Sequence, residues 1–220
     1  MKKIALSLLA LSLLGSTPVF ADVMAPLPAA LANHHGPVRI AVIRNLGSDD
    51  NTTQFLAGAI KQARKLGFKV NTFLSNGDDA RFQDFVNQAI IQKYDGIILS
   101  QGRAPYSDDL VKRITDAGIA VSVFDTAVPD NIPAVTVTRQ DDASLTDMSF
   151  GQLVKDLHGK ENIVTLWVAG FPPMDRREKE YQQLRKKTPG IKKLESLGAA
   201  ATAGQGDNAH KEGVIVARYQ

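Results

Sequence analysis

Hydrophobic and polar positions along this 220-residue chain alternate between short apolar runs and longer segments with helical periodicity. The runs are rich in β-branched residues, which is typical of strands that are buried on both faces of a parallel sheet. In the intervening segments, apolar residues recur at the spacing of an amphipathic helix. This alternation predicts an α/β fold built of right-handed βαβ units. Strands are predicted at residues 38–43, 69–74, 96–99, 119–124, 135–138, 162–168 and 191–197.

Three of the first four predicted strands end in polar segments, namely residues 44–51, residues 100–102, and Asp125 with Thr126. In open parallel sheets, ligands bind just beyond the carboxyl ends of the strands. The sequence therefore predicts a ligand crevice at this edge of the sheet, with Gln101 among its contacts.

The first polar segment holds Asp49, Asp50 and Asn51 directly before a predicted helix. Such side chains cap helix N-termini. One or two of them suffice as caps, so at least one carboxylate or amide is expected to face the crevice. A second acidic pair, Asp78 and Asp79, also precedes a predicted helix and is interpreted as capping alone.

Asp125 is the candidate that capping explains least. A carboxylate directly after a buried strand has to be satisfied by hydrogen bonds. No helix follows at once, because Pro129 and Pro133 predict an irregular link. A ligand-facing role for Asp125 is therefore favoured over a turn cap.

The N-terminus has the pattern of a secretory signal peptide. Lys2 and Lys3 precede an apolar run at residues 4–14, which is too short to span a bilayer, and small residues flank a cleavage site after Ala21. Export to the periplasm is predicted, with residues 1–21 removed. Residues 22–37, rich in alanine and proline, are predicted to be a flexible lead-in.

Composition excludes several classes of site. The chain has no cysteine, which excludes disulfide scaffolds and cysteine–metal centres, and the His34–His35 pair has no further ligands nearby in sequence, so no metal site is predicted. Lys2 and Lys3 supply two of the three formal positive charges, and no nucleic-acid partner is predicted. Gly47 alone is not a dinucleotide fingerprint, so no cofactor is predicted.

The leader, the βα units and the polar strand ends together resemble the type 1 periplasmic sugar-binding proteins, the ribose- and galactose-binding class. The resemblance runs from Val38 to the end of the chain. It rests on the order and spacing of residues 63–68, 94–100, 117–125 and 138–142. It implies two doubly wound parallel-sheet lobes, a first lobe over residues 38–138 and a partial second lobe over residues 139–220.

The same resemblance implies roles for individual residues. Asp125 matches the sugar-binding carboxylate of the family, Asp141 or Asp142 the polar hinge position, and Arg176 or Arg177 an arginine that opens a helix of the second lobe. The family often has aromatic residues at positions 49–52, and this chain does not, so ring stacking is expected from Phe171 or Trp167 instead. The predicted ligand-binding residues are Asp49, Asp50, Asn51, Gln101, Asp125, Asp141 and Arg176.

The implied function is capture of a sugar or related polyol by a monomer, which delivers it to the permease of an inner-membrane ABC transporter. Presentation of the bound state to a membrane chemoreceptor uses the same structure and remains an alternative. An exported carbohydrate-active hydrolase is disfavoured because the chain has no Gly-x-Ser-x-Gly elbow. A sugar-responsive transcription regulator is rejected, because no helix-turn-helix precedes Val38 and an export signal is present.

The identity of the sugar stays open. The acidic first loop favours a neutral polyhydroxyl ligand, whereas Arg44, Arg139 and Arg176 would tolerate an acidic one. The family's second lobe has further βα units, and this chain ends at Gln220, so the second lobe is expected to be incomplete and poorly protected. The chain alone is expected to have weak or absent sugar affinity.

Overall fold

The computed structural model describes residue 34 and residues 36–198. The predicted signal peptide, most of the predicted lead-in and the helical segment expected around Val214 lie outside the described residues. Within them, strands and helices alternate and all strand pairs are parallel, which confirms the predicted α/β fold.

The first unit is a five-stranded sheet with the order β2-β1-β3-β4-β5. The chain leaves β1 to one side to form β2 and then returns to the other side to form β3, so the topological switch lies between β1 and β3. Ligand crevices form at such a switch, beyond the carboxyl ends of the strands. The strands are β1 (Arg39–Arg44), β2 (Lys69–Leu74), β3 (Gly96–Ser100), β4 (Ala120–Phe124) and β5 (Val135–Thr138).

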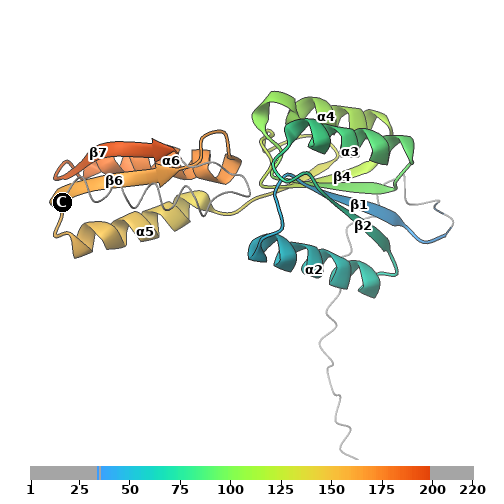
Figure 1. Cartoon of the computed structure of the whole chain (residues 1–220), viewed down its shortest axis with the longest axis horizontal. Coiled ribbons are helices and arrows are strands. Elements are labelled where there is room, and N and C mark those ends of the chain that lie inside the picture. The colour runs from blue at the N-terminus through green and yellow to red at the C-terminus, as the bar shows by residue number, and fades with distance from the viewer. Residues whose placement is uncertain (1–33, 35, 199–220) are drawn as a thin grey trace, which may run out of the picture.

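Helices cover both faces of this sheet (Figure 1). Helix α2 (Asp50–Lys65) lies on one face, and α3 (Asp79–Ile91) and α4 (Ala104–Asp116) lie on the other. The main core lies beneath α3 and α4, where apolar strand residues such as Leu99 and Val123 meet Phe82 and Leu110, all with no exposed surface. Alternation along β1, β3 and β4 sends every second side chain into this core.

Local sequence sets where these helices begin and end. Asp49 accepts a hydrogen bond from the backbone N–H of Thr52 at 2.6 Å and caps α2, and Asp78 caps α3 in the same way through Arg81 at 3.0 Å. Gly118 follows α4 with a φ of 72°, a left-handed conformation that glycine adopts without strain.

The second unit is a smaller α/β layer. Strands β6 (Glu161–Trp167) and β7 (Ile191–Gly198) form a two-stranded parallel sheet, and helices α5 (Asp142–Asp156) and α6 (Pro172–Lys187) pack beside it (Figure 1). The rings of Phe150 and Tyr181 meet edge to face with their centres 5.2 Å apart, and together with Ile191 they form a small core. Leu166 and Leu194 on the two strands stay 56% and 51% exposed.

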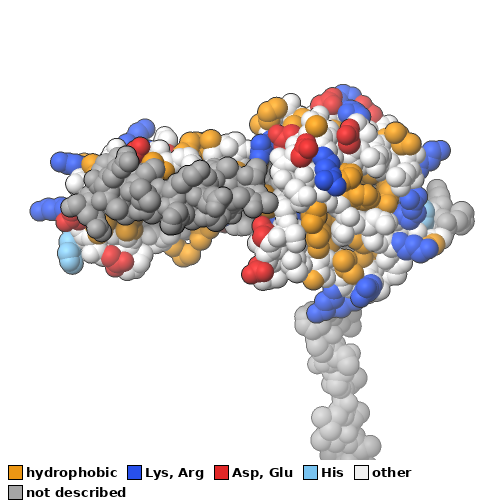
Figure 2. Space-filling model, in the orientation of Figure 1, with side chains coloured by type: hydrophobic (Ala, Val, Ile, Leu, Met, Phe, Trp, Pro, Cys, Tyr) orange, Lys and Arg blue, Asp and Glu red, His pale blue; other side chains and the backbone are white. Residues whose placement is uncertain are grey.

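The chain passes from the first unit to the second between β5 and α5. Acidic and basic side chains are interspersed over the visible face of the first unit, and both signs lie near its border with the second (Figure 2). In the described part of the chain, no helix combines the length and the apolar character needed to cross a membrane.

Candidate functional site

A cavity of about 370 Å³ lies between the two units, where the loops after β1 and β3 face the loop between β6 and α6. It is therefore at the switch point that the strand order predicts. Its lining comes from both units and consists of Leu46, Asp49, Asn51, Gln101, Gln140, Val168, Phe171, Pro173, Met174 and Arg177.

Arg44, the last residue of β1, is hydrogen-bonded to residues at the first-unit wall of this cavity. Its side chain is fully buried, and its guanidinium donates hydrogen bonds to Thr52 Oγ1 at 3.0 Å, Ser100 Oγ at 2.7 Å and Asn51 Oδ1 at 2.6 Å. The guanidinium carbon also lies 4.7 Å from the centre of the Phe55 ring. The amide of Asn51 is thereby held in one orientation at the cavity wall.

Burial is the main influence on the charge of this arginine. Desolvation lowers the pKa of Arg44, and the nearby carboxylates of Asp49 and Asp125 act in the opposite direction. The three hydrogen-bonding partners of the guanidinium are neutral, so its charge is balanced by these two carboxylates, of which Asp49 lines the cavity.

The three polar residues before and within the start of α2 have different positions. Asp49 caps the helix through Thr52 and lines the cavity as well. Asn51 lines the cavity while it accepts the hydrogen bond from Arg44. Asp50 is exposed in the first turn of the helix and is not among the residues that line the cavity. A capping residue and a non-capping residue thus both face the crevice.

Gln101 has the most unusual environment in the cavity wall. It follows β3 with a φ of 65°, a left-handed conformation that costs a non-glycine residue roughly 1–2 kcal/mol. Its side chain is only 5% exposed, and its Oε1 atom has no hydrogen-bond partner within the described part of the protein. A strained backbone and an unsatisfied buried acceptor are typical of functional sites, and they make Gln101 a candidate ligand contact.

Asp125 lies just behind the cavity and is engaged by the second unit. It is fully buried and has a φ of 47°. Its Oδ1 atom accepts a hydrogen bond from Arg176 Nη2 at 2.6 Å and from the backbone N–H of Gln140 at 3.3 Å, and its Oδ2 atom accepts a longer one from Gln140 Nε2 at 3.4 Å. The structure therefore places this carboxylate at the junction of the two units and not among the lining residues.

Two adjacent arginines at the start of α6 converge on Asp142, the first residue of α5. Arg176 Nε donates to Asp142 Oδ2 at 2.8 Å, and Arg177 Nε donates to Asp142 Oδ1 at 2.7 Å. Arg177 also donates to the side chain of Gln140 at 2.9 Å. Arg176 thus connects Asp125 of the first unit to Asp142, which is itself 3% exposed.

Asp141 and Asp142, at the predicted hinge, have different hydrogen-bond partners. Asp141 caps α5 by accepting hydrogen bonds from Ser144 at 3.0 Å and 2.6 Å, and these bonds lower the pKa of Asp141. It lines a separate hollow of about 460 Å³, as does Arg176, and neither residue lines the cavity between the units. Asp142 takes the arginine contacts.

Asp79 shows that the capping interpretation was wrong for one residue of its pair. Asp78 caps α3, but the carboxylate of Asp79 accepts hydrogen bonds from Asn45 Nδ2 and the Tyr106 hydroxyl, both at 2.8 Å. Burial raises the pKa of Tyr106 above its usual value. Asn45, Asp79 and Tyr106 come from three separate segments, so spacing along the chain did not reveal this network.

Sequence reasoning also missed most of the second-unit wall. Phe171, one of the two expected stacking residues, does line the cavity, whereas Trp167 does not. Val168, Pro173 and Met174 were not singled out, and a signal for them existed in the irregular apolar loop directly after the sixth strand.

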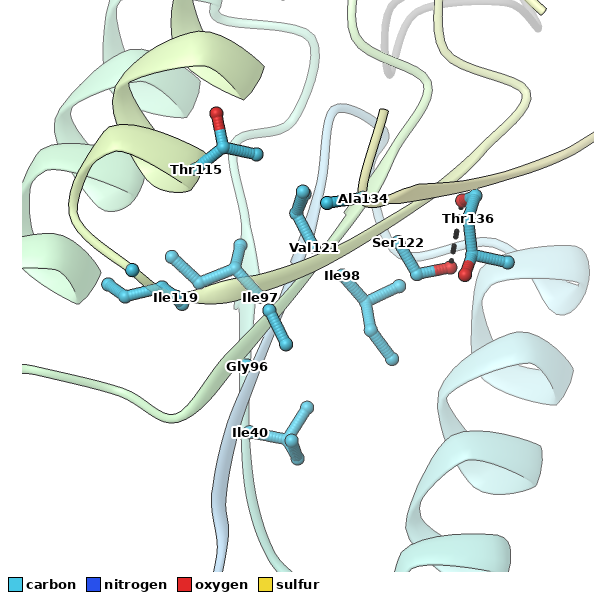
Figure 3. A pocket seen from close by; sticks show the side chains of 12 residues that line it. Ile40, Gly96, Ile97, Ile98, Thr115, Ile119, Val121, Ser122, Ala134 and Thr136 are labelled. Atoms are coloured by element: carbon cyan, nitrogen blue, oxygen red, sulfur yellow. Dashed lines mark hydrogen bonds between the residues drawn. The ribbon is translucent and has the colours of Figure 1, made fainter. Parts of the chain in front are cut away.

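A second hollow of about 440 Å³ lies over β3 and β4 in the first unit (Figure 3). Its labelled side chains are mainly aliphatic, including Ile40, Ile98 and Val121, and the hydrogen bond drawn there joins Ser122 Oγ to the backbone oxygen of Thr136 at 3.2 Å. Residues from the end of α4 border it, so it lies toward the amino ends of the strands. It has no charged lining residue and is not suited to orient a polyhydroxyl ligand.

Comparison with known proteins gives consistent matches. A family model described as "Periplasmic binding protein domain" matches residues 40–213. A crystal structure of a sugar ABC transporter from Yersinia enterocolitica subsp. enterocolitica 8081 is 68% identical with a TM-score of 0.81, over 89% of this chain and 59% of that one. A search of curated proteins found no match.

Two more distant structures share the fold. The 5-methylthioribose transporter solute binding protein from Thermotoga lettingae TMO, solved in complex with 5-methylthioribose, is 33% identical with a TM-score of 0.74, over 80% of this chain and 54% of that one. An ABC transporter solute binding protein from Agrobacterium vitis with bound allitol is 21% identical with a TM-score of 0.74, over 83% and 63%. The present chain spans 54–63% of the length of these three proteins.

Proposed function

The chain belongs to the periplasmic binding protein family, and on this premise we propose that it captures a sugar or related polyol between two lobes and delivers it to an inner-membrane ABC transporter. The first lobe comprises residues 38–138 and the second begins at residue 139. The protein acts as a monomer, and its leader is cleaved after Ala21. Membership of this family implies a periplasmic location.

One observation supports this proposal above the others, namely the unsatisfied acceptor of Gln101 in a cavity lined by both lobes. A buried polar atom without a partner costs free energy, roughly 1–3 kcal/mol. A ligand hydroxyl that donates to Gln101 Oε1 removes this penalty. Because Oε1 is itself buried, the Gln101 side chain turns toward the cavity to make this contact.

Contacts from both lobes would favour closure. A ligand shifts the open–closed equilibrium only by binding one state better than the other. Asp49, Asn51 and Gln101 bind the ligand from the first lobe, and Phe171 covers it from the second. Asp50, which is exposed in the first turn of α2, contacts the ligand as it enters, and Asp141 contacts it from the hinge.

Asp125 and Arg176 join the site when the ligand enters. A carboxylate can accept about four hydrogen bonds, and the longest contact of Asp125 is the one from Gln140 Nε2 at 3.4 Å. A ligand hydroxyl takes the place of this exposed amide, while Arg176 keeps its contact with Oδ1. Asp125→Ala therefore weakens sugar binding by about 10- to 150-fold, which corresponds to roughly 1.5–3 kcal/mol.

A thermal-shift screen of the full-length protein, including any chain that precedes or follows these residues, tests the proposal. Ribose, galactose, arabinose, allitol and 5-methylthioribose form the panel, and calorimetry then measures Kd for any sugar that raises the melting temperature. At 100 times Kd a ligand stabilises the folded state by about 2.7 kcal/mol. The proposal predicts stabilisation by at least one of these compounds, and no stabilisation by any of them at millimolar concentration would contradict it.

A further inference from the structure

The two walls of the cavity between the lobes differ in polarity. The first-lobe wall presents Asp49, Asn51 and Gln101 together with the apolar Leu46, and Arg44 is hydrogen-bonded to Asn51. The second-lobe wall presents four apolar residues, which are Val168, Phe171, Pro173 and Met174. A ligand that fills the cavity therefore meets hydrogen-bonding groups on one side and hydrocarbon on the other.

The charged residue of the second-lobe wall, Arg177, uses two of its five N–H donors within the protein. Arg177 donates through Nε to Asp142 at 2.7 Å and through Nη2 to Gln140 at 2.9 Å. Phe171 stands at the N-cap position of α6 and makes no side-chain hydrogen bond to the helix. Gln140 and Arg177 are the polar lining residues on this side and are hydrogen-bonded to each other, so the part of the wall formed by Val168, Phe171, Pro173 and Met174 presents hydrocarbon to a ligand.

A sugar hydroxyl pressed against such a wall loses its bonds to water and gains none in return, which weakens binding. A hydrogen, methyl or thioether group at the same position gains from burial instead. Building on the proposed function, we propose that the natural ligand is a sugar in which an apolar substituent replaces one hydroxyl group. Its remaining hydroxyls face the first lobe, and the substituent faces Phe171 and Met174.

Ring stacking explains only part of this wall. One aromatic ring, that of Phe171, is sufficient to cover the C–H face of a fully hydroxylated sugar. Val168, Pro173 and Met174 add aliphatic surface that stacking does not require. If the wall only stacks on a fully hydroxylated sugar, replacing a hydroxyl weakens binding. If the wall accommodates an apolar substituent, replacing that hydroxyl improves binding.

Two matched series of probes make that comparison by calorimetry on the full-length protein. One is ribose, 5-deoxyribose and 5-O-methylribose, and the other is galactose, 6-deoxygalactose and 6-O-methylgalactose. A single added carbon in an apolar pocket is worth about 10- to 200-fold in discrimination. In at least one series, the deoxy or O-methyl sugar is expected to bind at least about 10-fold tighter than its parent.

Each outcome bears on one proposal or both. If the parent sugars bind as tightly as their analogues, or tighter, the apolar-substituent inference is overturned and the proposed function stands. If none of the six compounds binds, the apolar-substituent inference is overturned for these two sugar frameworks, and the proposed function is decided by the wider thermal-shift panel. Tighter binding of the analogues supports both.

Variants of Met174 test whether the second-lobe wall causes the preference for the deoxy or O-methyl sugar. Met174→Gln makes the wall polar at similar volume and is expected to reduce the preference for the analogue about 10-fold, whereas Met174→Leu keeps the wall apolar and retains the preference. Met148→Gln changes a methionine that is 68% exposed on α5 and is the matched control, with no change expected. Equal preference in Met174→Gln and Met174→Leu would overturn the assignment of the substituent to this wall, and melting temperatures establish that each variant folds.

Discussion

The guanidinium of Arg176 lies 2.6 Å from a carboxylate oxygen of Asp125 and so joins the start of α6 in the second lobe to the end of β4 in the first. The carboxylate has no exposed surface, and the arginine side chain is 24% exposed. A buried charge whose partner is removed remains desolvated without compensation.

Arg176→Ala is therefore expected to lower the free energy of unfolding by about 3 kcal/mol. Urea denaturation measures the change. Arg177→Ala is the matched control, because Arg177 contacts Asp142 and Gln140 but leaves Asp125 paired, and it is expected to cost less. In a double-mutant cycle, Asp125→Asn with Arg176→Ala should cost less than the sum of the single changes. Strict additivity would show that the pair does not hold the lobes together.

Gln101→Gly is expected to raise the free energy of unfolding and to lower the affinity for the sugar. Glycine adopts the φ of 65° without strain and removes the unsatisfied Oε1 atom, so the free energy of unfolding should rise by about 1 kcal/mol. Sugar affinity should fall about 10-fold, because a ligand contact is lost. Lys93→Gly, at an exposed residue with a φ of 52° after α3, should raise stability with unchanged affinity. Unchanged affinity in Gln101→Gly would remove Gln101 from the site.

Tyr106→Phe tests the network that joins β1, α3 and α4. The hydroxyl donates to Asp79 at 2.8 Å and accepts from Asn45 at 2.9 Å, so its removal should lower the free energy of unfolding by about 1–3 kcal/mol at neutral pH. A loss well below this range would mean that the network contributes little to stability.

The same variant predicts a pH dependence. Burial raises the pKa of Tyr106, so above about pH 10 the unfolded chain loses a phenolic proton that the folded chain retains. The stability from this group is fully present below about pH 10 and declines as pH rises toward the folded pKa. The difference in stability between the unmodified protein and Tyr106→Phe should thus narrow above about pH 10, and a constant difference would contradict the role of burial.

Hydrogen exchange is expected to differ between the lobes. The first lobe has a core of fully buried residues on three adjacent strands, whereas the second has Phe150, Tyr181 and Ile191. Few buried apolar contacts mean a low free energy of local opening. Amides of β6 and β7 should therefore exchange faster than those of β1 and β3. Equal protection of both sheets would contradict the expectation.

Periodicity was sufficient to predict the elements of the fold. The second and fifth strands begin and end where predicted, at Lys69–Leu74 and Val135–Thr138, and the other strands differ by one residue at either end or both. Short β-branched runs between amphipathic helices leave little freedom in β1, β3 and β4, which supply the buried core, whereas Leu166 of β6 and Leu194 of β7 remain exposed.

The partners of polar side chains were less predictable. Asn45 and Asp79 are hydrogen-bonded across 34 positions, and Arg176 reaches Asp125 across 51. Such pairs are set by how the strand ends converge, which spacing along the chain does not record. For the same reason Asp141 and Asp142 could not be told apart, although one caps a helix and the other binds two arginines.

The polar wall of the cavity is also part of the framework of the first lobe, since Asp49 begins α2 and Asn51 is tied to Arg44. Substituting either residue alters folding as well as recognition. Within the described residues, the side chains of Phe171 and Met174 in the opposite wall make no hydrogen bonds. Side chains in the loop before α6 and in its first turn can therefore be exchanged at little cost to stability, and a change of ligand preference is expected to come most easily from these positions.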